Sequence, residues 1–554
     1  MSPVSGTQSL AALAATVSHD QPMKFERLMF PTARRTLFVS ALLVAATVAC
    51  TDLSVAPKST LTDANAFNEP GSYKAYIAKI YGGLQVSGQE GPAGRPDIQG
   101  IDEGFGGYIR LIWQMQELPT EETAIAWNDA GVQELNTQLW GSNNQFLVAM
   151  YGRVYFQVGL VNEFLRQTTD ALLASRGVTG DLLADVKRYR AEARFLRALS
   201  YWHGIDLFGD LPLVTEEFAL GLTPPKQSTR TEIFQYIVSE LTAIRNDLPA
   251  PRAGGYGRAD QGAVAMLLAK VYLNAQVYSG TARYADARTE IEKVIAGSYT
   301  LDPSYAHLFL ADNHTSPELV FSIPYDGAKT QSYGGTTFLT HAAVGGSMDA
   351  KNFGLDGGWY GLRARPEFVA LFPSTSGAPD RRSGALWTDG QTVAMTNLTD
   401  FSKGLPAPKF RNVTSTGAPG SSGGFADVDF PMFRLGDAYL MYAEAVVRGG
   451  GGSRATALGY INALRARAYG GASGNITDAQ MTLDFLRDER ARELYWEGHR
   501  RTDLIRFDRF TTNGVWAWKG NVAAGKTTEA FRNLYPLPAT ELSSNPNLKQ
   551  NAGY

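Results

Sequence analysis

The sequence predicts a mainly α-helical body built on tetratricopeptide-like helix pairs, with a loop-rich insertion that contains short strands. Three observations support this fold class. Apolar residues recur at helical spacing in several long segments. Two stretches share a helix–turn–helix plan of roughly 30–35 residues each. Residues 300–430 are instead rich in Gly, Ser, Thr, Asn and Asp and show little periodicity, which indicates irregular structure.

Amphipathic helices are expected in the N-terminal half over residues 72–84, 146–168 and 186–205. In the first of them, Tyr73, Ile77 and Ile80 fall on one stripe because their spacing follows the helical period. The last of them ends in the turn sequence Phe-Gly-Asp-Leu-Pro at residues 208–212. These helices would supply one apolar face each to a shared core.

Two helix pairs are expected further along the chain, at residues 262–276 with 284–296 and at residues 437–448 with 455–468. A Gly-containing turn joins the helices of each pair, and alanines occur where the two helices could cross closely. The alternative is two unrelated amphipathic hairpins. Because the pairs are far apart in the sequence, a simple solenoid is not expected.

The N-terminus has the features of a targeting segment. From Met29, two arginines precede an apolar run at residues 37–48, which is too short to span a bilayer. Small residues and then Cys50, the only cysteine of the chain, follow this run. We therefore expect residues 1–49 to be removed and Cys50 to be the site of lipid attachment. The alternative is an ordinary signal peptide with a chance cysteine.

The predicted organisation is a signal segment at 1–49, a lipid anchor and tether at 50–65, an N-terminal helical part with the tetratricopeptide-like pairs at 66–300, an irregular ligand-face insertion at 301–430, and a C-terminal helical part at 431–554. Within the insertion, residues 318–324 are typical of a short strand. Long irregular stretches inside an ordered protein often carry function. We therefore expect the insertion to present the ligand face.

Composition excludes several classes of protein. With 51 Lys+Arg against 54 Asp+Glu the net charge is −3, whereas nucleic-acid binders normally carry a basic excess, so no nucleic-acid partner is expected. At 44% hydrophobic residues, global disorder is excluded. A single cysteine excludes a disulfide framework and a Cys-rich metal site, and the six histidines are scattered. Neither a metal nor a cofactor is expected.

Ordered motifs recur through most of the chain: 193–199 (ARFLRAL), 208–214 (FGDLPLV), 229–232 (TRTE), 433–445 (FRLGDAYLMYAEA), 461–467 (INALRAR), 487–507 (RDERARELYWEGHRRTDLIRF), 534–538 (LYPLP) and the tail 550–554 (QNAGY). Together with the cysteine after the apolar run, they resemble the SusD/RagB family of outer-membrane nutrient-binding lipoproteins. In the tail, Ala552 stands where the family often has Pro.

The resemblance implies a SusD-like helical body with a loop-rich ligand face. It also implies a lipid-anchored, surface-exposed protein of the outer membrane. Such a protein sits as a lid on a SusC-like TonB-dependent transporter barrel and captures glycans, or sometimes peptides, for import. None of this follows from composition or periodicity.

A glycoside hydrolase is an alternative, because Glu489, Glu493 and Glu497 recur at a spacing of four residues and would share one helix face. Carboxylates on one helix face have no second wall to hold a sugar. Arg490 and Arg492 interleave with them, so an ion-pair-laced structural helix is expected instead. The patterns Gly-x-Ser-x-Gly and Gly-x-x-x-x-Gly-Lys-Thr occur at residues 420–424 and 520–527, but neither lies between a strand pattern and a helix pattern. A nucleophile elbow or a phosphate loop needs that context, so neither is assigned and enzymatic activity is not expected.

Sugar binding needs flat aromatic faces beside amides and carboxylates. Sequence context assigns Trp113, Trp140, Trp202 and Trp496 to the core and leaves Trp516 and Trp518 ambiguous. The ligand-binding candidates lie in polar or Gly- and Asp-rich stretches without periodicity: Trp127, Asn128, Asp129, Trp359, Tyr360 and Trp387. We expect the first five of these to lie on one exposed side of the helical body. The alternative for each tryptophan is packing.

The function predicted from the sequence is therefore that of a non-enzymatic glycan-binding lipoprotein acting in oligosaccharide uptake. A peptide or other polymer binder of the same architecture is the main alternative, and a tetratricopeptide-like interaction scaffold without a small ligand is another. An exposed aromatic cluster with polar neighbours would favour the binder over the scaffold.

Overall fold

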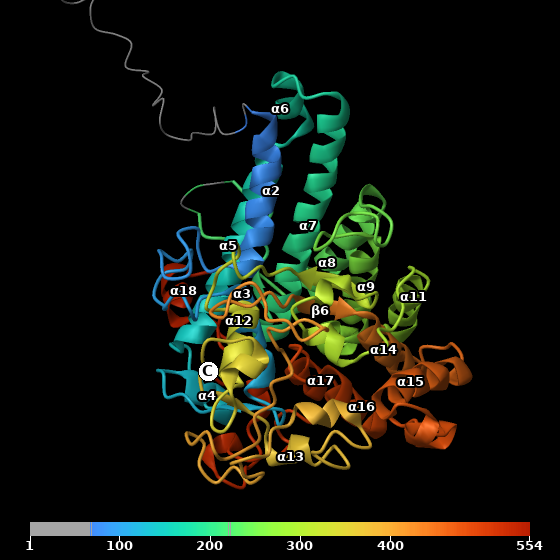
Figure 1. The fold of residues 1–554 in the computed structure, drawn as a ribbon. Helices are drawn as coiled ribbons and strands as arrows, with labels where there is room; N and C mark the ends of the chain where they lie inside the picture. The colour runs from blue at the N-terminus through green and yellow to red at the C-terminus, as the bar shows by residue number, and fades with distance from the viewer. Residues whose placement is uncertain (1–66, 68, 220, 222) are drawn as a thin grey trace, which may run out of the picture. The chain divides into compact units, whose positions relative to one another are not determined.

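The computed structural model describes residues 67, 69–219, 221 and 223–554 (Figure 1). The described residues all belong to one compact unit, Asp63–Tyr554. The predicted signal segment and Cys50 lie outside the described residues. Within the described part, no helix is both long enough and apolar enough to cross a membrane.

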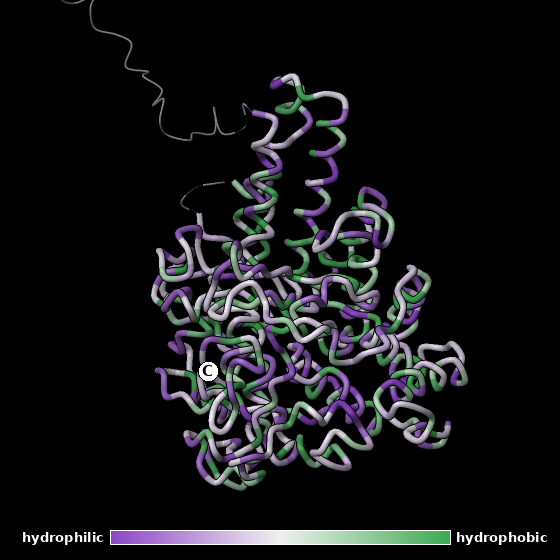
Figure 2. Tube along the Cα trace, in the orientation of Figure 1, coloured by the Kyte–Doolittle hydropathy of each residue, from purple (hydrophilic) through white to green (hydrophobic). Residues whose placement is uncertain are grey.

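The N-terminal part is a layer of long helices: α2 (Pro70–Gln85), α3 (Tyr108–Glu117), α5 (Gln145–Gln167), α7 (Gly180–Phe208) and α8 (Arg230–Ile244). Helices α2, α5 and α7 run side by side, and α7 also packs against α8 (Figure 1). In Figure 2 hydrophobic and hydrophilic residues alternate along α2, as in an amphipathic helix, whereas α7 is buried at every residue from Phe195 to Phe208. The three helices predicted from periodicity are confirmed.

Two helix pairs follow: α9 (Gln261–Leu273) and α10 (Ala275–Ser279) with α11 (Tyr284–Ile295), and α14 (Leu435–Val447) with α15 (Arg454–Tyr469). The carboxylate of Asp260 caps α9, and the Ser453 hydroxyl caps α15. Helix α11 packs against both α9 and α14, so the two pairs adjoin in space although they are far apart in the sequence. They form one continuous helical layer.

Short antiparallel ladders join distant segments. Strand β4 (Leu319–Ile323) pairs with β6 (Phe430–Arg434), β1 (Ala124–Ile125) pairs with β5 (Leu362–Arg363), and β2 (Leu211–Pro212) pairs with β3 (Gln227–Ser228). The predicted strand at 318–324 is therefore confirmed as β4. The β1–β5 ladder matters most for function, because it brings a loop of the N-terminal part against the insertion.

The remaining elements are short: α4 (Val132–Thr137), α6 (Asp170–Ser175), α12 (Gly335–Ala342), α13 (Pro366–Val369), α16 (Leu483–Leu494), α17 (Arg500–Arg506), α18 (Ala539–Ser544), and 3₁₀ turns at Arg245–Asp247, Ala306–Phe309, Asn313–Thr315, Ala350–Phe353, Arg381–Ala385, Ala472–Gly474, Asp478–Gln480, Lys519–Asn521 and Ala530–Asn533. Helix α12 lies inside the predicted irregular insertion. All its residues are buried, including Thr336, Thr337, Thr340 and His341, and a helix of 8 residues is too short to establish a helical period in the sequence.

The burial of the tryptophans in the structure agrees with the burial predicted from their sequence contexts. Trp113, Trp140, Trp202 and Trp496 are buried in the core, as predicted. Of the two ambiguous residues, Trp516 is also buried, whereas Trp518 is half-buried against a small cluster with Met395 and Leu398. The tryptophans in helical patterns are therefore structural.

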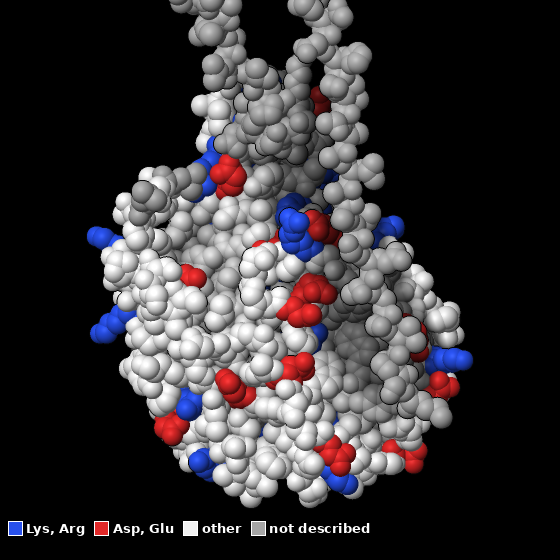
Figure 3. All heavy atoms as spheres, turned by 90° about the vertical axis from the view of Figure 1, so that its left-hand side faces the viewer, with Lys and Arg blue, Asp and Glu red and all other residues white. Residues whose placement is uncertain are grey.

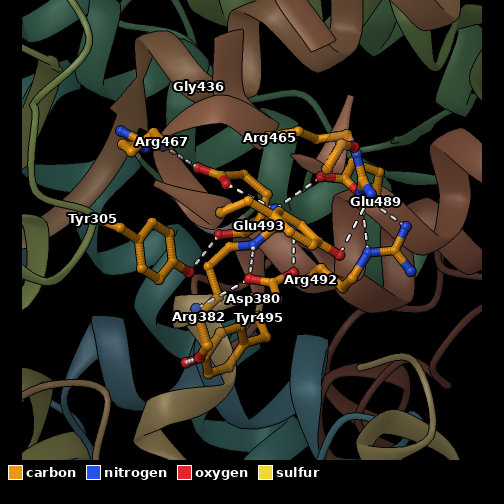
Figure 4. A network of polar contacts seen from close by, with 12 residues as sticks. Tyr305, Asp380, Arg382, Gly436, Arg465, Arg467, Glu489, Arg492, Glu493 and Tyr495 are labelled. Atoms are coloured by element: carbon orange, nitrogen blue, oxygen red, sulfur yellow. Dashed lines mark hydrogen bonds and ion pairs between the residues drawn. The ribbon is translucent and has the colours of Figure 1, made fainter. Parts of the chain in front are cut away.

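The glutamate series forms a buried ion-pair network (Figure 4). The guanidinium of Arg382 contacts Glu489 at 2.9 Å and Glu493 at 3.1 Å, and that of Arg434 contacts Glu493 at 2.9 Å and Glu497 at 2.6 Å. All five side chains are buried. Since these arginines come from the insertion and from β6, the network fastens both segments to α16.

One detail of the sequence-based prediction was wrong. Helix α16 ends at Leu494, and Trp496 has a positive φ of 63°, so Glu497 lies beyond the helix rather than on its face. The Glu497 carboxylate still enters the network because the chain turns back on itself there. Burial acts to raise the pKa of the Glu489 and Glu497 carboxyls, but the neighbouring arginines outweigh it and lower each pKa to about 2.

Candidate functional site

The β1–β5 ladder brings two of the candidate tryptophans together. Trp127 follows β1 and Trp359 precedes β5, and the strands pair Ile125 with Leu362. The indole N–H of Trp127 donates a hydrogen bond of 2.8 Å to the carbonyl oxygen of Trp359. The ring centroids lie 6.3 Å apart, with 47° between the ring planes. Both side chains are half-buried, so each ring leaves part of its surface open.

Tyr333 extends this pair to three rings. Its ring centroid lies 6.4 Å from that of Trp359 with an interplanar angle of 55°, and its side chain is 37% exposed. Behind it, the ring of Phe425 lies 5.3 Å away. We call Trp127, Tyr333 and Trp359 the aromatic platform. Sequence reasoning missed Tyr333, although it lies in the same Gly- and Ser-rich insertion as Trp359.

Helix α12 supports the platform from below. The imidazole of His341 lies 4.6 Å from the ring of Trp359 at 31°, and the ring of Phe338 lies 5.8 Å from that of Trp127. Burial lowers the pKa of His341 from its usual value, so the imidazole is neutral at physiological pH. The buried helix therefore gives the platform a rigid and uncharged base.

A buried cation lies beside the platform. The guanidinium carbon of Arg110, on α3, lies 4.3 Å from the ring centre of Phe338, 4.4 Å from that of Phe105 and 5.5 Å from that of Trp127. Burial lowers the pKa of Arg110 to about 9, so the group stays charged at neutral pH. Its Nε and Nη2 atoms have no hydrogen-bond partner within the described part of the chain. Sequence reasoning missed this residue as well.

Carboxylates and amides surround the rings. Asn128, Asp129 and Asp102 are exposed, and the negative charges of the two aspartates act on Arg110 and oppose the fall of its pKa. The platform thus combines tilted aromatic rings with exposed carboxylate and amide groups. Such a set can stack on the C–H face of a sugar and bind its hydroxyl groups.

Two further candidates belong to a neighbouring cluster. Tyr360 is 52% exposed and has a positive φ of 54°, which turns its side chain away from that of Trp359 and toward Phe401, 5.4 Å away. Trp387 donates from its indole N–H to the Ser347 hydroxyl at 2.9 Å. A bulky residue held at positive φ is strained, and such strain concentrates at functional sites. These two residues flank the platform without direct ring contact with it.

The surrounding surface is weakly charged. Figure 3 views the side of the molecule on which α4 and α18 lie, and its described residues show isolated acidic and basic side chains without a continuous basic patch. No group of three or more His, Cys, Asp or Glu side chains within the described residues is arranged to hold a metal ion. The absence of nucleic-acid and metal partners stays a prediction.

The geometry also bears on glycoside hydrolysis. That reaction needs two carboxyl groups facing each other across an open cleft. Glu489, Glu493 and Glu497 are buried and paired with arginines, so none of them can reach a sugar. The glutamate series is structural.

Comparisons with known proteins agree with the sequence motifs. The model of the SusD family matches residues 382–554. The starch-binding protein SusD of Bacteroides thetaiotaomicron is 36% identical over 91% of this chain and 95% of its own length. SusD-like protein P2 of Formosa agariphila is 26% identical over 76% of this chain and 83% of its own length.

Solved structures show the same fold. Surface glycan-binding protein A from Bacteroides thetaiotaomicron, solved in complex with laminarihexaose, aligns with a TM-score of 0.66 at 21% identity, over 86% of this chain and 98% of that one. A SusD superfamily protein from Bacteroides vulgatus aligns with a TM-score of 0.67 at 18% identity, over 88% of this chain and all of that one (100%). The mainly helical fold predicted from the sequence is confirmed.

Proposed function

This chain belongs to the SusD family, and on that premise we propose that it is a non-enzymatic, cell-surface glycan-binding protein that captures oligosaccharides for uptake. The observation that carries the proposal is the aromatic platform of Trp127, Tyr333 and Trp359. Half-buried aromatic rings that keep one face open are costly unless a partner covers them. The open faces lie among charged and amide groups, which is the setting that a sugar ring requires.

Binding would combine stacking with polar contacts. Sugar C–H groups would cover the exposed parts of the rings, while the exposed side-chain amide of Asn128 would donate to hydroxyl oxygens. The carboxylates of Asp102 and Asp129 would accept from hydroxyl groups. Each stacking contact contributes about 0.5–1.5 kcal/mol by analogy with aromatic pairs.

The tilt of the rings favours a glycan that bends. The planes of Trp127 and Tyr333 make angles of 47° and 55° with that of Trp359. A flat, extended chain could not lie on all three faces at once, whereas a chain that turns between residues could. Together with the starch-binding relative, this makes a starch-type α-glucan the first ligand to test.

Attachment to the outer membrane through Cys50 is part of the same proposal. Acyl chains on this cysteine would hold the protein at the surface, since each buried CH₂ contributes roughly 0.8 kcal/mol. Mass spectrometry of the native N-terminus tests this step. An unmodified Cys50 within an intact precursor would contradict it.

The proposed partner is a SusC-like TonB-dependent transporter barrel on which this protein acts as a lid. The support is family membership, which is an associational argument. Purification from detergent-solubilised outer membranes should recover a large barrel protein with this chain. Recovery of no barrel protein above background would count against the partnership.

Affinity gel electrophoresis tests the binding function itself. The full-length protein, solubilised in detergent, is run through gels that contain amylopectin, pullulan, laminarin or xylan. We expect retardation by at least the α-glucans amylopectin and pullulan. Retardation by none of the four polysaccharides would favour the alternatives, a peptide binder or an interaction scaffold.

A further inference from the structure

Apart from the aromatic platform, an open cavity lies beside the β4–β6 ladder. It has a volume of about 550 Å³, and its walls include Tyr256, His314, Asp326, Asp427 and Asp429. Asp326 follows β4 in the chain, and Asp427 and Asp429 immediately precede β6. We call this cavity the Tyr256 groove. None of the residues singled out in the sequence lies in it.

The groove presents an aromatic face to solvent. Tyr256 is 48% exposed, yet its hydroxyl is anchored, because it donates to the buried carboxylate of Asp429 at 2.5 Å. The imidazole of His314 packs against the ring at a centroid distance of 6.2 Å and an angle of 75°. A tyrosine that is fixed at its hydroxyl end and open on its ring surface is a ready stacking surface.

Carboxylates are fixed around this ring. Asp427 accepts hydrogen bonds from the backbone N–H groups of Gly327 at 2.6 Å and Ser421 at 2.5 Å. Neither Asp427 nor Asp429 forms an ion pair within the described residues, and burial raises the pKa of Asp429 to about 6. Asp326 is paired with Lys329 at 3.0 Å, so the oriented acceptors of the groove that form no ion pair in the described structure are those of Asp427 and Asp429.

A buried hydroxyl in the wall is left unused. Tyr325 lines the groove and is only 6% exposed. Its hydroxyl lies beside Gly335, at the start of α12, and has no hydrogen-bond partner in the described structure. Through this contact the wall of the groove touches α12, the helix beneath the platform.

The groove is connected to the aromatic platform through shared elements. Residues 421–429 carry Asp427 of the groove and also Phe425, whose ring backs Tyr333 of the platform at 5.3 Å. The backbone N–H of Ala426 donates to the Thr337 hydroxyl on α12, the helix beneath the platform. One short segment thus forms part of both surfaces.

We infer that the Tyr256 groove is a second saccharide subsite, which takes the extension of a neutral glycan whose first part lies on the aromatic platform. The inference rests on the proposed glycan-binding function and deepens it. Stacking on Tyr256 and hydroxyl contacts with Asp427 supply the recognition. Because the groove is acidic, it disfavours glycans that carry carboxylate or sulfate groups.

The test compares a short and a long ligand on full-length protein in detergent. Maltotriose, measured by titration calorimetry, reports on the platform, and amylopectin, measured by affinity gel electrophoresis, reports on both surfaces. Tyr256→Ala should weaken amylopectin retention several-fold and leave maltotriose affinity unchanged. Tyr256→Phe, which keeps the ring, should retain amylopectin like the wild type. Carboxymethylated amylopectin should be held equally by wild type and Tyr256→Ala.

Each of the remaining outcomes contradicts a specific part of the proposal. Unchanged amylopectin retention in a folded Tyr256→Ala variant removes the subsite and leaves the platform intact. Equal weakening for both ligands shows that Tyr256 acts through the platform, which also overturns the inference. Failure of the wild type to bind either ligand overturns the α-glucan proposal and this inference together. If Tyr256→Ala does not fold, the same two ligands are compared on the variant His314→Ala, because His314 is exposed.

Discussion

The indole N–H of Trp127 donates a 2.8 Å hydrogen bond to the carbonyl oxygen of Trp359 across 232 residues of sequence. This bond fixes the tilt between two rings that come from different parts of the fold. Trp127→Phe keeps an aromatic ring but removes the donor. We expect a loss of about 0.5–1.5 kcal/mol in the free energy of unfolding, measured in urea, together with weaker glycan binding. Unaltered affinity would show that the bond does not set the geometry of the platform.

Arg110 offers a second test because its buried guanidinium supports the platform from within. Its Nη1 donates to the backbone carbonyl oxygens of Gly104 at 2.7 Å and Tyr333 at 3.4 Å. Arg110→Met keeps the bulk of the side chain and removes these donors. A hydrogen bond from a charged donor contributes about 1.5–3 kcal/mol, so the free energy of unfolding should fall by about that amount, and maltotriose should bind more weakly because Tyr333 loses its anchor. Urea unfolding and calorimetric titration measure the two effects, and wild-type maltotriose affinity in the variant would show that Arg110 does not position Tyr333.

The buried ion-pair network predicts an effect on stability alone. Glu493→Gln leaves the guanidinium groups of Arg382 and Arg434 with one carboxylate fewer. Breaking a buried pair on one side costs about 3–5 kcal/mol, which urea unfolding would register. The matched control is Asp484→Asn, which breaks an exposed pair with Arg487 and should cost no more than about 1 kcal/mol. Equal losses in the two variants would contradict a structural role for the network.

A pair of buried carboxyl groups predicts a dependence on pH. Burial raises the pKa of Glu117 to about 7 and that of Glu122 well above its ordinary value. A folded-state pKa above the unfolded value means that the folded protein binds the proton more tightly. This contribution to stability is therefore present at low pH and is lost as pH rises from about 4.5 to about 7.

Glu117→Gln isolates that contribution. The glutamine oxygen can still accept from the backbone N–H groups of Gly498 and His499, which both bond the same carboxylate oxygen in the wild type. The stability of the variant relative to the wild type should rise between pH 4.5 and pH 7 and then level off. Urea unfolding at a series of pH values measures the difference. A constant difference would show that the pair does not titrate in this range.

Periodicity predicted α2 and α5 because each has a buried apolar face and a more exposed polar face. It failed at α12, whose 8 residues are too few to establish a helical period, and at the end of α16, where a positive φ at Trp496 breaks the helix before Glu497. The second failure reflects tertiary packing that overrides the local pattern. The sequence also did not predict that the two helix pairs pack against each other, because this packing depends on contacts between distant segments.

The site was predictable only in part. Gly- and Asp-rich context indicated Trp127 and Trp359, and the structure brings these two together. The same context gave no reason to choose Tyr333, and Arg110 lies in a helix whose residues are all buried. Whether Asn128, Asp129, Tyr360 and Trp387 touch a ligand stays a prediction, because proximity alone does not establish contact.

The central claim is that the aromatic platform binds glycan, and the affinity of Trp359→Ala for amylopectin tests it most directly. The control is Tyr460→Ala, which removes a half-buried ring on α15, where it stacks on Tyr439 in the helical layer. Melting temperatures of both variants separate binding from folding. The account predicts that Trp359→Ala binds roughly two- to tenfold more weakly, as expected for one lost stacking contact, while Tyr460→Ala binds like the wild type. Wild-type affinity in a folded Trp359→Ala variant would contradict it.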